Sequence, residues 1–183
     1  KKKKNFISRS TASSSSSLSI TSGINSTYKE YIFVFNNIHP SGSADSLGFT
    51  FNASIDGGSN YNVTKTTTFC NSYHYENGSG AVLQYSDGSD IAQGTGYQSI
   101  AFSSANSDDG VSGTLHLFDP SSTTFVKHFV CSLNGLFINS SVSANNFTFP
   151  AGYFNTTSAI NAVDFKMASG NIDSGTIDMY GVL

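Results

Sequence analysis

Charged residues are scarce in this 183-residue chain. Asp, Glu, Lys and Arg make up 11% of the sequence, against about 25% in ordinary globular domains. Ser, Thr, Asn and Gly must therefore cover most of the surface, and these residues are poor helix formers. This composition excludes an all-helical protein. A membrane span is excluded as well, because no run approaches the roughly 18 consecutive apolar residues that a spanning helix needs.

Cysteine is also rare. Cys70 and Cys131 are the only two, they are far apart, and each lies in a strand-like run. The sequence therefore contains no Cys-x-x-Cys pair and no Cys/His cluster of the kind that binds zinc. We expect both cysteines to be small buried hydrophobic residues. A disulfide between them stays open, since it would form if their strands were neighbours.

The basic residues gather at the start of the chain. Five of the nine lie within the first nine positions: Lys1, Lys2, Lys3, Lys4 and Arg9. The remainder carries four lysines against twelve acidic residues, so the basic stripe typical of nucleic-acid binding is missing. A Ser-dominated segment follows at residues 8–19. We expect residues 1–17 to form an extended arm that packs on another chain and attaches the protein to a particle; a solvated tail is the alternative.

From residue 18 onward, short strand-like runs alternate with turn residues. Residues 31–36 are apolar at nearly every position, which predicts a strand buried on both faces. Residues 47–55 alternate strictly, which predicts one buried face and one face in contact with solvent. The Asp-Gly-Gly-Ser sequence at 56–59 then predicts the turn of a hairpin with residues 61–69, where Lys65 is in phase with the apolar positions.

The same pattern continues to the carboxyl end. Further strands are expected at residues 81–85, 98–104, 113–118, 124–133, 146–154, 159–169 and 176–182. Turns are expected between them at residues 86–90, 105–110, 119–122, at Asn134 and Gly135, and at 170–175. About nine or ten short strands at spacings near ten residues predict an all-β protein, an antiparallel sandwich or barrel.

No catalytic constellation stands out in the sequence. The four histidines are His39, His74, His116 and His128, and no Gly-x-Ser-x-Gly nucleophile motif is present. Most aspartates lie in turn contexts, where they act first as turn formers. His116 and His128 lie in adjacent predicted strands, so they would bind a metal as a pair, but two histidines on a polar strand face are the simpler interpretation. We expect a non-enzymatic protein without catalytic residues, metal or cofactor.

Two regions carry side chains suited to ligand binding. Residues 86–90 and 105–110 are dense in oxygen atoms, which suggests calcium, although neither fits an EF-hand loop. Tyr73, His74 and Tyr75 lie in a segment that we expect to be a loop. Exposed Tyr with Asn and Ser is typical of surfaces that bind sugars, so this loop is a candidate glycan site. The alternative is that its rings pack across a subunit interface or cap the sandwich.

Several segments resemble one class of phage virion proteins. Residues 20–62 contain Tyr-x-x-Tyr, Asn-Ile-x-Pro and Asp-Gly-Gly in order, and residues 170–183 end in a Gly-to-Gly turn, one strand and Tyr-Gly. Residues 113–129 and 151–167 are also similar to members from marine and cyanobacterial phages. The resemblance covers nearly all of residues 18–183, but not the basic arm, and it weakens over residues 72–90. It implies a jelly-roll β-sandwich in a tail fibre, tail appendage or capsid decoration protein, usually a trimer.

We therefore expect an all-β, antiparallel, jelly-roll-like β-sandwich over residues 18–183, preceded by the extended arm at 1–17. The expected function is that of a surface-exposed virion structural protein whose partners are copies of itself, in a homotrimer, and other virion proteins. A carbohydrate-binding module that recognises a host surface glycan is the alternative. Neither function involves nucleic acid or a membrane span. Four large apolar residues exceed the needs of one sandwich and are expected at an inter-subunit surface: Phe137, Ile138, Phe147 and Phe149.

Overall fold

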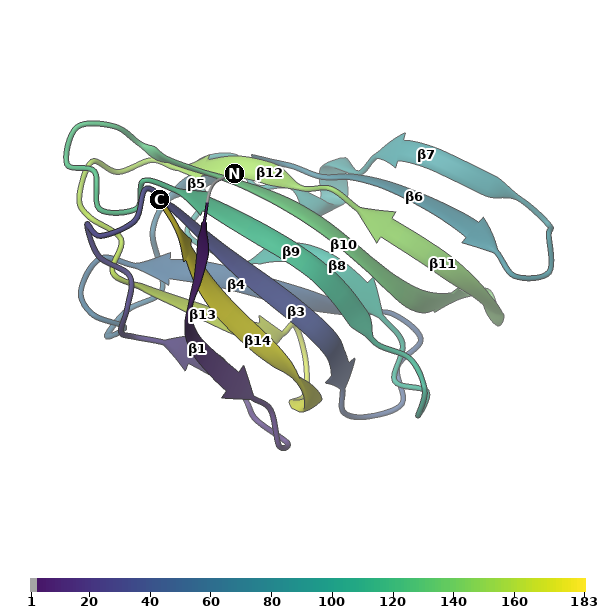
Figure 1. The fold of residues 1–183 in the computed structure, drawn as a ribbon. Helices are drawn as coiled ribbons and strands as arrows, with labels where there is room; N and C mark the ends of the chain where they lie inside the picture. Colours follow the sequence, from purple (N-terminus) through teal and green to yellow (C-terminus); the bar gives the residue numbers. More distant parts are fainter. Residues whose placement is uncertain (1–2) are drawn as a thin grey trace.

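The computed structural model describes residues 3–183 as a β protein with one short 3-10 helix, η1 (Asp87–Ser89) (Figure 1). No helix in this range is long and apolar enough to cross a membrane. The strands are β1 (Lys4–Thr11), β2 (Leu18–Ile20), β3 (Glu30–Pro40), β4 (Leu47–Ser54), β5 (Lys65–Thr68), β6 (Cys70–Tyr75), β7 (Ala81–Tyr85), β8 (Gln98–Ser103), β9 (Val111–Phe118), β10 (Lys127–Asn139), β11 (Val142–Thr148), β12 (Ala151–Phe154), β13 (Ala162–Met167) and β14 (Ile172–Val182).

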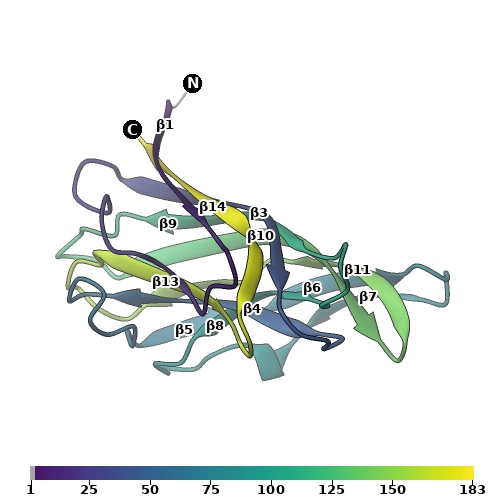
Figure 2. The ribbon, with the colours of Figure 1, turned by 90° about the horizontal axis from the view of Figure 1, so that it is seen from below.

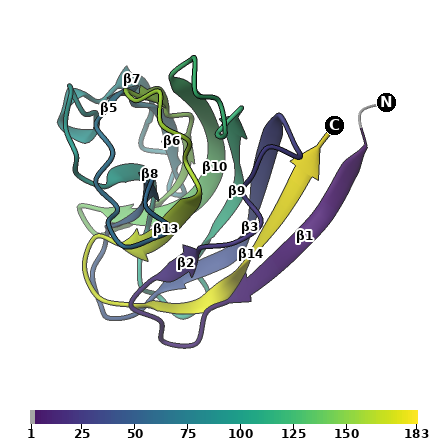
Figure 3. The same ribbon diagram turned by 90° about the vertical axis from the view of Figure 1, so that its left-hand side faces the viewer.

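The strands form two antiparallel sheets that pack against each other. Sheet A has ten strands in the order β1-β14-β3-β9-β10-β11-β6-β7, with β12 beside β10 and β5 beside β12. Sheet B has four strands in the order β2-β13-β4-β8. The chain crosses between the sheets several times, although β5 to β7 and β9 to β12 stay within sheet A, and sheet A curves around sheet B (Figure 3). Two antiparallel sheets packed against each other confirm the predicted all-β sandwich.

Phenylalanine side chains join the two sheets. The ring centroid of Phe165 in β13 lies 5.5 and 5.3 Å from those of Phe33 and Phe35 in β3. It also lies 6.1 Å from both Phe49 and Phe51 in the neighbouring strand β4. All five rings are buried. The inward positions predicted from the alternation in residues 31–36 and 47–55 therefore form the centre of the core.

The prediction that one face of residues 47–55 meets solvent is wrong. Strand β4 is buried along its whole length beyond its first residue. Loops cover its polar face, and the Asn52 side-chain amide donates hydrogen bonds to the carbonyls of Tyr61 (2.6 Å) and Thr95 (2.9 Å). Because buried polar groups are satisfied by such bonds, a polar alternation does not by itself distinguish a wet face from one covered by backbone.

The predicted hairpin around residues 56–59 does not form. The chain does turn there, but β4 belongs to sheet B and β5 to sheet A. The chain crosses to the opposite sheet at this point. A turn sequence specifies the local backbone conformation, not the sheet to which the next strand belongs.

The predicted turn at Asn134 and Gly135 is also wrong, because both residues lie inside β10. The chain turns instead at Ser140 and Ser141, which have φ values of 51° and 65°. Glycine at 135 serves a close approach between the sheets: a Cβ atom there would lie 2.6 Å from the carbonyl oxygen of Phe102 in β8. Close backbone approach and tight turns both favour glycine, and the sequence cannot separate them.

The amino-terminal segment is a strand of the protein's own sandwich, which corrects the expectation that it packs on another chain. Strand β1 pairs with β14 from Lys4 opposite Val182 to Thr11 opposite Thr176, so the chain ends lie side by side (Figure 2). The following Ser-rich stretch also bonds to β14, where Ser14 N donates to Asp173 O at 2.9 Å. This segment buries little apolar surface. It is ordered because its backbone forms hydrogen bonds with the open edge of sheet A.

An ion pair fastens this strand. The Arg9 guanidinium donates two hydrogen bonds to the Asp178 carboxylate, at 2.6 and 2.7 Å, and Asp178 is only 4% exposed. The hydrogen bonds from Arg9 lower the pKa of Asp178. The pair therefore stabilises the folded protein above the pKa of an unfolded aspartate and loses this effect as the pH falls through the folded pKa.

Two lysines are buried on either side of Phe154. Strand β12 places Phe154 opposite Lys65 of β5 and opposite Lys127 of β10. Neither lysine is exposed, and their ammonium groups donate to the carbonyls of Gly96 (2.5 Å) and Thr156 (3.0 Å). Burial lowers the pKa of Lys65 from 10.5 to about 8, and it also lowers the pKa of Lys127.

Replacement of Lys65 by Met should remove a pH dependence of stability. Above its folded pKa of about 8, Lys65 is neutral in the native state while the unfolded chain still binds the proton, so wild-type stability rises with pH. Relative to Lys65→Met, the wild-type free energy of unfolding should increase by about 2 to 3 kcal/mol between about pH 7 and pH 10.5. Urea unfolding at several pH values measures this difference; the exposed Lys4→Met variant should show none of it.

Replacement of Arg9 by Ala should destabilise the protein mainly at neutral pH. The substitution leaves the buried Asp178 carboxylate without its guanidinium partner, and this loss disappears once the carboxylate is protonated. Thermal unfolding should therefore show a lower melting temperature for Arg9→Ala near pH 7 and convergence with the wild type once the pH falls below the lowered pKa of Asp178. Equal melting temperatures at pH 7, matching an exposed Lys4→Ala control, would contradict a fastening role for Arg9.

Candidate functional site

Sheet A is wider than sheet B, and one end of it has no partner sheet. Strands β6 and β7, with the adjoining parts of β10 and β11, continue past the region covered by β8, the edge strand of sheet B (Figure 1). We call this part the extension of sheet A. Its inner face turns toward β8, and its outer face turns away from the sandwich.

The inner face of the extension borders a cleft of about 320 Å³. None of the described residues that line it carries a charge. Amide and aromatic side chains dominate, and we call it the amide–aromatic cleft. Its principal residues are Asn71, Tyr73, Gln84, Phe137, Asn139 and Asn146.

Aromatic rings form one wall of the cleft. The Tyr73 ring meets those of Tyr75 and Phe137 edge-on, with centroids 5.4 and 5.7 Å away. The Tyr75 hydroxyl accepts a hydrogen bond of 2.7 Å from Asn139 Nδ2. Burial is the main cause that raises the pKa of Tyr73, and the hydrogen bond with the Tyr75 hydroxyl is the second cause. Tyr73 is therefore a neutral hydrogen-bonding group and an apolar surface at neutral pH.

Asn71 forms the polar floor of the cleft. It is 6% exposed, and its Nδ2 donates to Oδ1 of Asn146, which is 2% exposed, at 3.2 Å. The Oδ1 atom of Asn71 is buried and has no hydrogen-bond partner among residues 3–183. An unsatisfied buried acceptor costs about 1 to 3 kcal/mol. The sandwich therefore tolerates a polar group at a place where an apolar residue would stabilise it.

The structure corrects the expectation of a Tyr-rich loop. Tyr73, His74 and Tyr75 belong to strand β6, and the turn comes after them, at residues 76–79. Because strand residues alternate between faces, the two tyrosines point to the inner face and His74 to the outer face. The sequence thus identified the two rings, but it missed Asn71 and Asn146, since only the pairing of β6 with β11 brings these amides together.

The four residues expected at an inter-subunit surface separate into two places. Phe137 lines the amide–aromatic cleft, and Ile138 is half-buried near the end of β10. Phe147 is 38% exposed on the outer face, where its ring lies 5.6 Å from that of Phe149. None of the four belongs to the buried core.

The outer face of sheet A exposes further large apolar side chains from β9 to β7. The strand registers place them on one side of the sheet, and their exposed fractions run from 38% to 75%. We call this set the outer apolar surface. It consists of Leu83, Tyr85, Phe118, Val130 and Phe147.

The residues proposed for attachment lie at the edge formed by β1. Lys1 and Lys2 fall outside the described residues, and Lys3 and Lys4 are exposed. Arg9 is engaged with Asp178 inside the same chain. Its charge therefore serves the fold of this sandwich, and any attachment through the basic segment would rest on the lysines.

The histidines and cysteines lie in separate places. His116 Nδ1 lies 2.7 Å from Glu30 Oε1, whereas the His128 ring contacts Tyr153, so the two histidines have different partners. Cys70 and Cys131 are both free thiols; Cys131 is buried as predicted, but Cys70 is only half-buried, which corrects that expectation. Burial raises the pKa of Cys131 well above its ordinary value. Across residues 3–183, no group of three or more His, Cys, Asp or Glu side chains could hold a metal ion.

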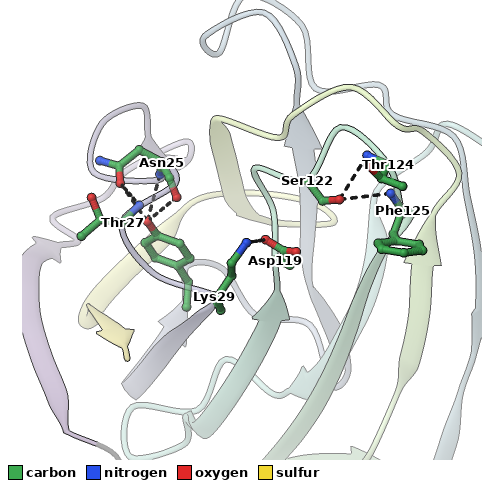
Figure 4. Close-up of polar contacts among 8 residues, drawn as sticks. Asn25, Thr27, Lys29, Asp119, Ser122, Thr124 and Phe125 are labelled. Carbon is green, nitrogen blue, oxygen red and sulfur yellow. Dashed lines mark hydrogen bonds and ion pairs between the residues drawn. The ribbon is translucent and has the colours of Figure 1, made fainter.

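Polar contacts fix the loops at the end of the sandwich where the termini lie (Figure 4). Lys29 Nζ lies 3.0 Å from the Asp119 carboxylate, and Asp119 N donates to Lys29 O at 2.6 Å. Ser122 Oγ accepts hydrogen bonds from the backbone amides of Thr124 (3.2 Å) and Phe125 (3.0 Å). Phe125 is 70% exposed on this loop, apart from the outer apolar surface, and it provides a matched control for that surface.

Comparisons with protein-family models, with curated proteins and with solved structures found no match to this chain. Two surfaces of sheet A are suited to interactions, namely the amide–aromatic cleft and the outer apolar surface.

Proposed function

We propose that the protein is a non-enzymatic structural subunit on the surface of a phage particle, in a tail fibre, tail appendage or capsid decoration. In this proposal it assembles with copies of itself through the outer apolar surface. The phage assignment rests on the sequence resemblance of residues 20–62 and 170–183. The assembly rests on the outer face of sheet A.

The observation that carries the assembly is the exposure of large apolar side chains on an uncovered sheet face. Leu83 is 75% exposed, Tyr85 53% and Val130 47%. Extended apolar patches on a soluble protein generally mark interaction sites. In a chain whose surface is rich in Ser, Thr, Asn and Gly, these side chains offer apolar area that association would bury. The resemblance favours three copies.

Two carboxylates, Asp56 and Asp164, have structural roles. Asp56 caps the turn after β4 through Ser54 and Asn60, and these hydrogen bonds lower its pKa to about 2. Asp164 accepts hydrogen bonds from Ser19 and Tyr97 across sheet B and its covering loop. Carboxylates held in this way stabilise loops and strands, and they are already bonded within the chain.

Polar substitution of the outer apolar surface should dissociate the assembly. Burial of a large apolar side chain contributes about 1.5 to 3 kcal/mol, so Leu83→Ser with Phe147→Ser should weaken self-association by about a hundredfold or more. Sedimentation equilibrium at micromolar concentration should find the wild type as an oligomer and the double variant as a monomer. Phe125→Ser, which removes a ring that is 70% exposed on the loop after β9, should leave the oligomer intact. A monomeric wild type would overturn the proposed assembly.

The location in a particle requires a separate experiment. Mass spectrometry of purified virions should detect the chain, and gold-labelled antibodies should mark either the tail or the capsid. Absence from particles of a phage that expresses the protein would overturn the structural assignment, whatever the oligomeric state.

A further inference from the structure

We infer that the amide–aromatic cleft is a binding site for a short, neutral saccharide. The site lies on the inner face of the extension of sheet A, so it is separate from the outer apolar surface. The inference therefore goes beyond the proposed assembly and does not depend on it.

The aromatic wall provides the apolar half of sugar recognition. A pyranose ring has a face of C–H groups, and such a face packs against aromatic rings. Tyr73 and Phe137 are both half-buried and lie edge to face. They present fixed apolar surface that loses little conformational entropy on binding, because each side chain has only two rotatable angles.

The amides provide the polar half. Each Asn or Gln side chain offers a carbonyl acceptor and two N–H donors, which matches neighbouring hydroxyl groups that both donate and accept. Gln84 of β7 lies directly opposite Asn71 of β6 in the strand register, and Asn146 lies on the other side of that strand, next to Tyr73. A row of amides across three strands thus borders the rings.

The unpartnered Oδ1 of Asn71 indicates a ligand. This atom is an acceptor held in a buried position without a donor, and buried polar groups in native proteins are generally paired. A ligand hydroxyl that enters the cleft supplies the missing donor after a small rotation of the Asn71 side chain. The cost of the unsatisfied acceptor in the unbound protein is then recovered on binding.

The uncharged lining of the cleft determines which chemical class of ligand it favours. No lysine, arginine or carboxylate lines the cleft, so a charged ligand would lose hydration without gaining a partner of opposite charge. This disfavours sialic acids, uronic acids and charged peptides. It favours hexoses, deoxyhexoses and N-acetylhexosamines, whose polar groups are hydroxyls and amides.

Saturation-transfer NMR tests the inference on the intact chain. The probes are the neutral sugars glucose, galactose, mannose, rhamnose, N-acetylglucosamine and N-acetylgalactosamine and their disaccharides, each at millimolar concentration, with galacturonic acid as the charged comparison. At least one neutral probe should receive saturation at its ring C–H protons, and galacturonic acid should receive none. No transfer to any neutral probe, or equal transfer to galacturonic acid, would overturn the inference.

Two variants locate the binding in the cleft. Asn71→Leu with Asn146→Leu replaces both members of a buried pair, so the fold should be as stable as the wild type or more stable, while sugar binding is abolished. Tyr73→Ala should weaken binding by about three- to tenfold through loss of ring contact. Phe125→Ala, which removes an exposed ring from the loop after β9, should change neither binding nor oligomeric state. Retained sugar binding in the folded double variant would overturn the assignment of the site to the cleft. Because the double variant should keep the wild-type oligomeric state, loss of sugar binding can be distinguished from a failure of the proposed assembly.

Discussion

The aromatic core around Phe165 can join only as much of sheet A as the four strands of sheet B can cover. The remaining strands of the ten-stranded sheet must be stabilised by pairing with each other, and both of their faces stay accessible. This inequality creates the extension that carries β6 and β7. The amide–aromatic cleft therefore follows from one constraint, namely that the second sheet is too narrow to complete the sandwich. The outer apolar surface lies on the face of sheet A that turns away from sheet B.

The alternation of apolar and polar residues correctly predicted those features of the fold that depend on one strand alone. It identified the buried positions of β3, the inward positions of β4 and the inward position of Lys65. It failed where the outcome depends on pairing between distant segments. At residues 56–59, the turn residues do not specify which sheet the next strand joins. At Asn134 and Gly135, a tight turn and a close backbone approach favour the same residues.

The prediction for the amino-terminal segment was wrong for an energetic reason. A Ser-rich chain has little apolar surface, and an estimate based on burial alone predicts that it cannot offset an ordering cost of about 1 to 2 kcal/mol per residue. Strand β14, however, lies at the edge of sheet A unless another strand pairs with it. Its unpaired backbone groups are a template for any extended segment, and the arm meets them with a ladder of hydrogen bonds and the Arg9–Asp178 pair. Composition does not reveal such an edge.

The amide–aromatic cleft and the outer apolar surface lie on opposite faces of sheet A, and the roles that we propose for them are linked. Because strand residues alternate, the same strands β6 and β11 direct Tyr73 and Asn146 toward the cleft and Phe147 toward the outer face. Association through the outer face leaves the cleft open, so an oligomer would present several identical clefts on one assembly. Small neutral sites bind single sugars weakly, and several sites that engage one polysaccharide raise the overall affinity through effective concentration. Self-association would thus make a weak saccharide site useful on a particle, without any change in the site itself.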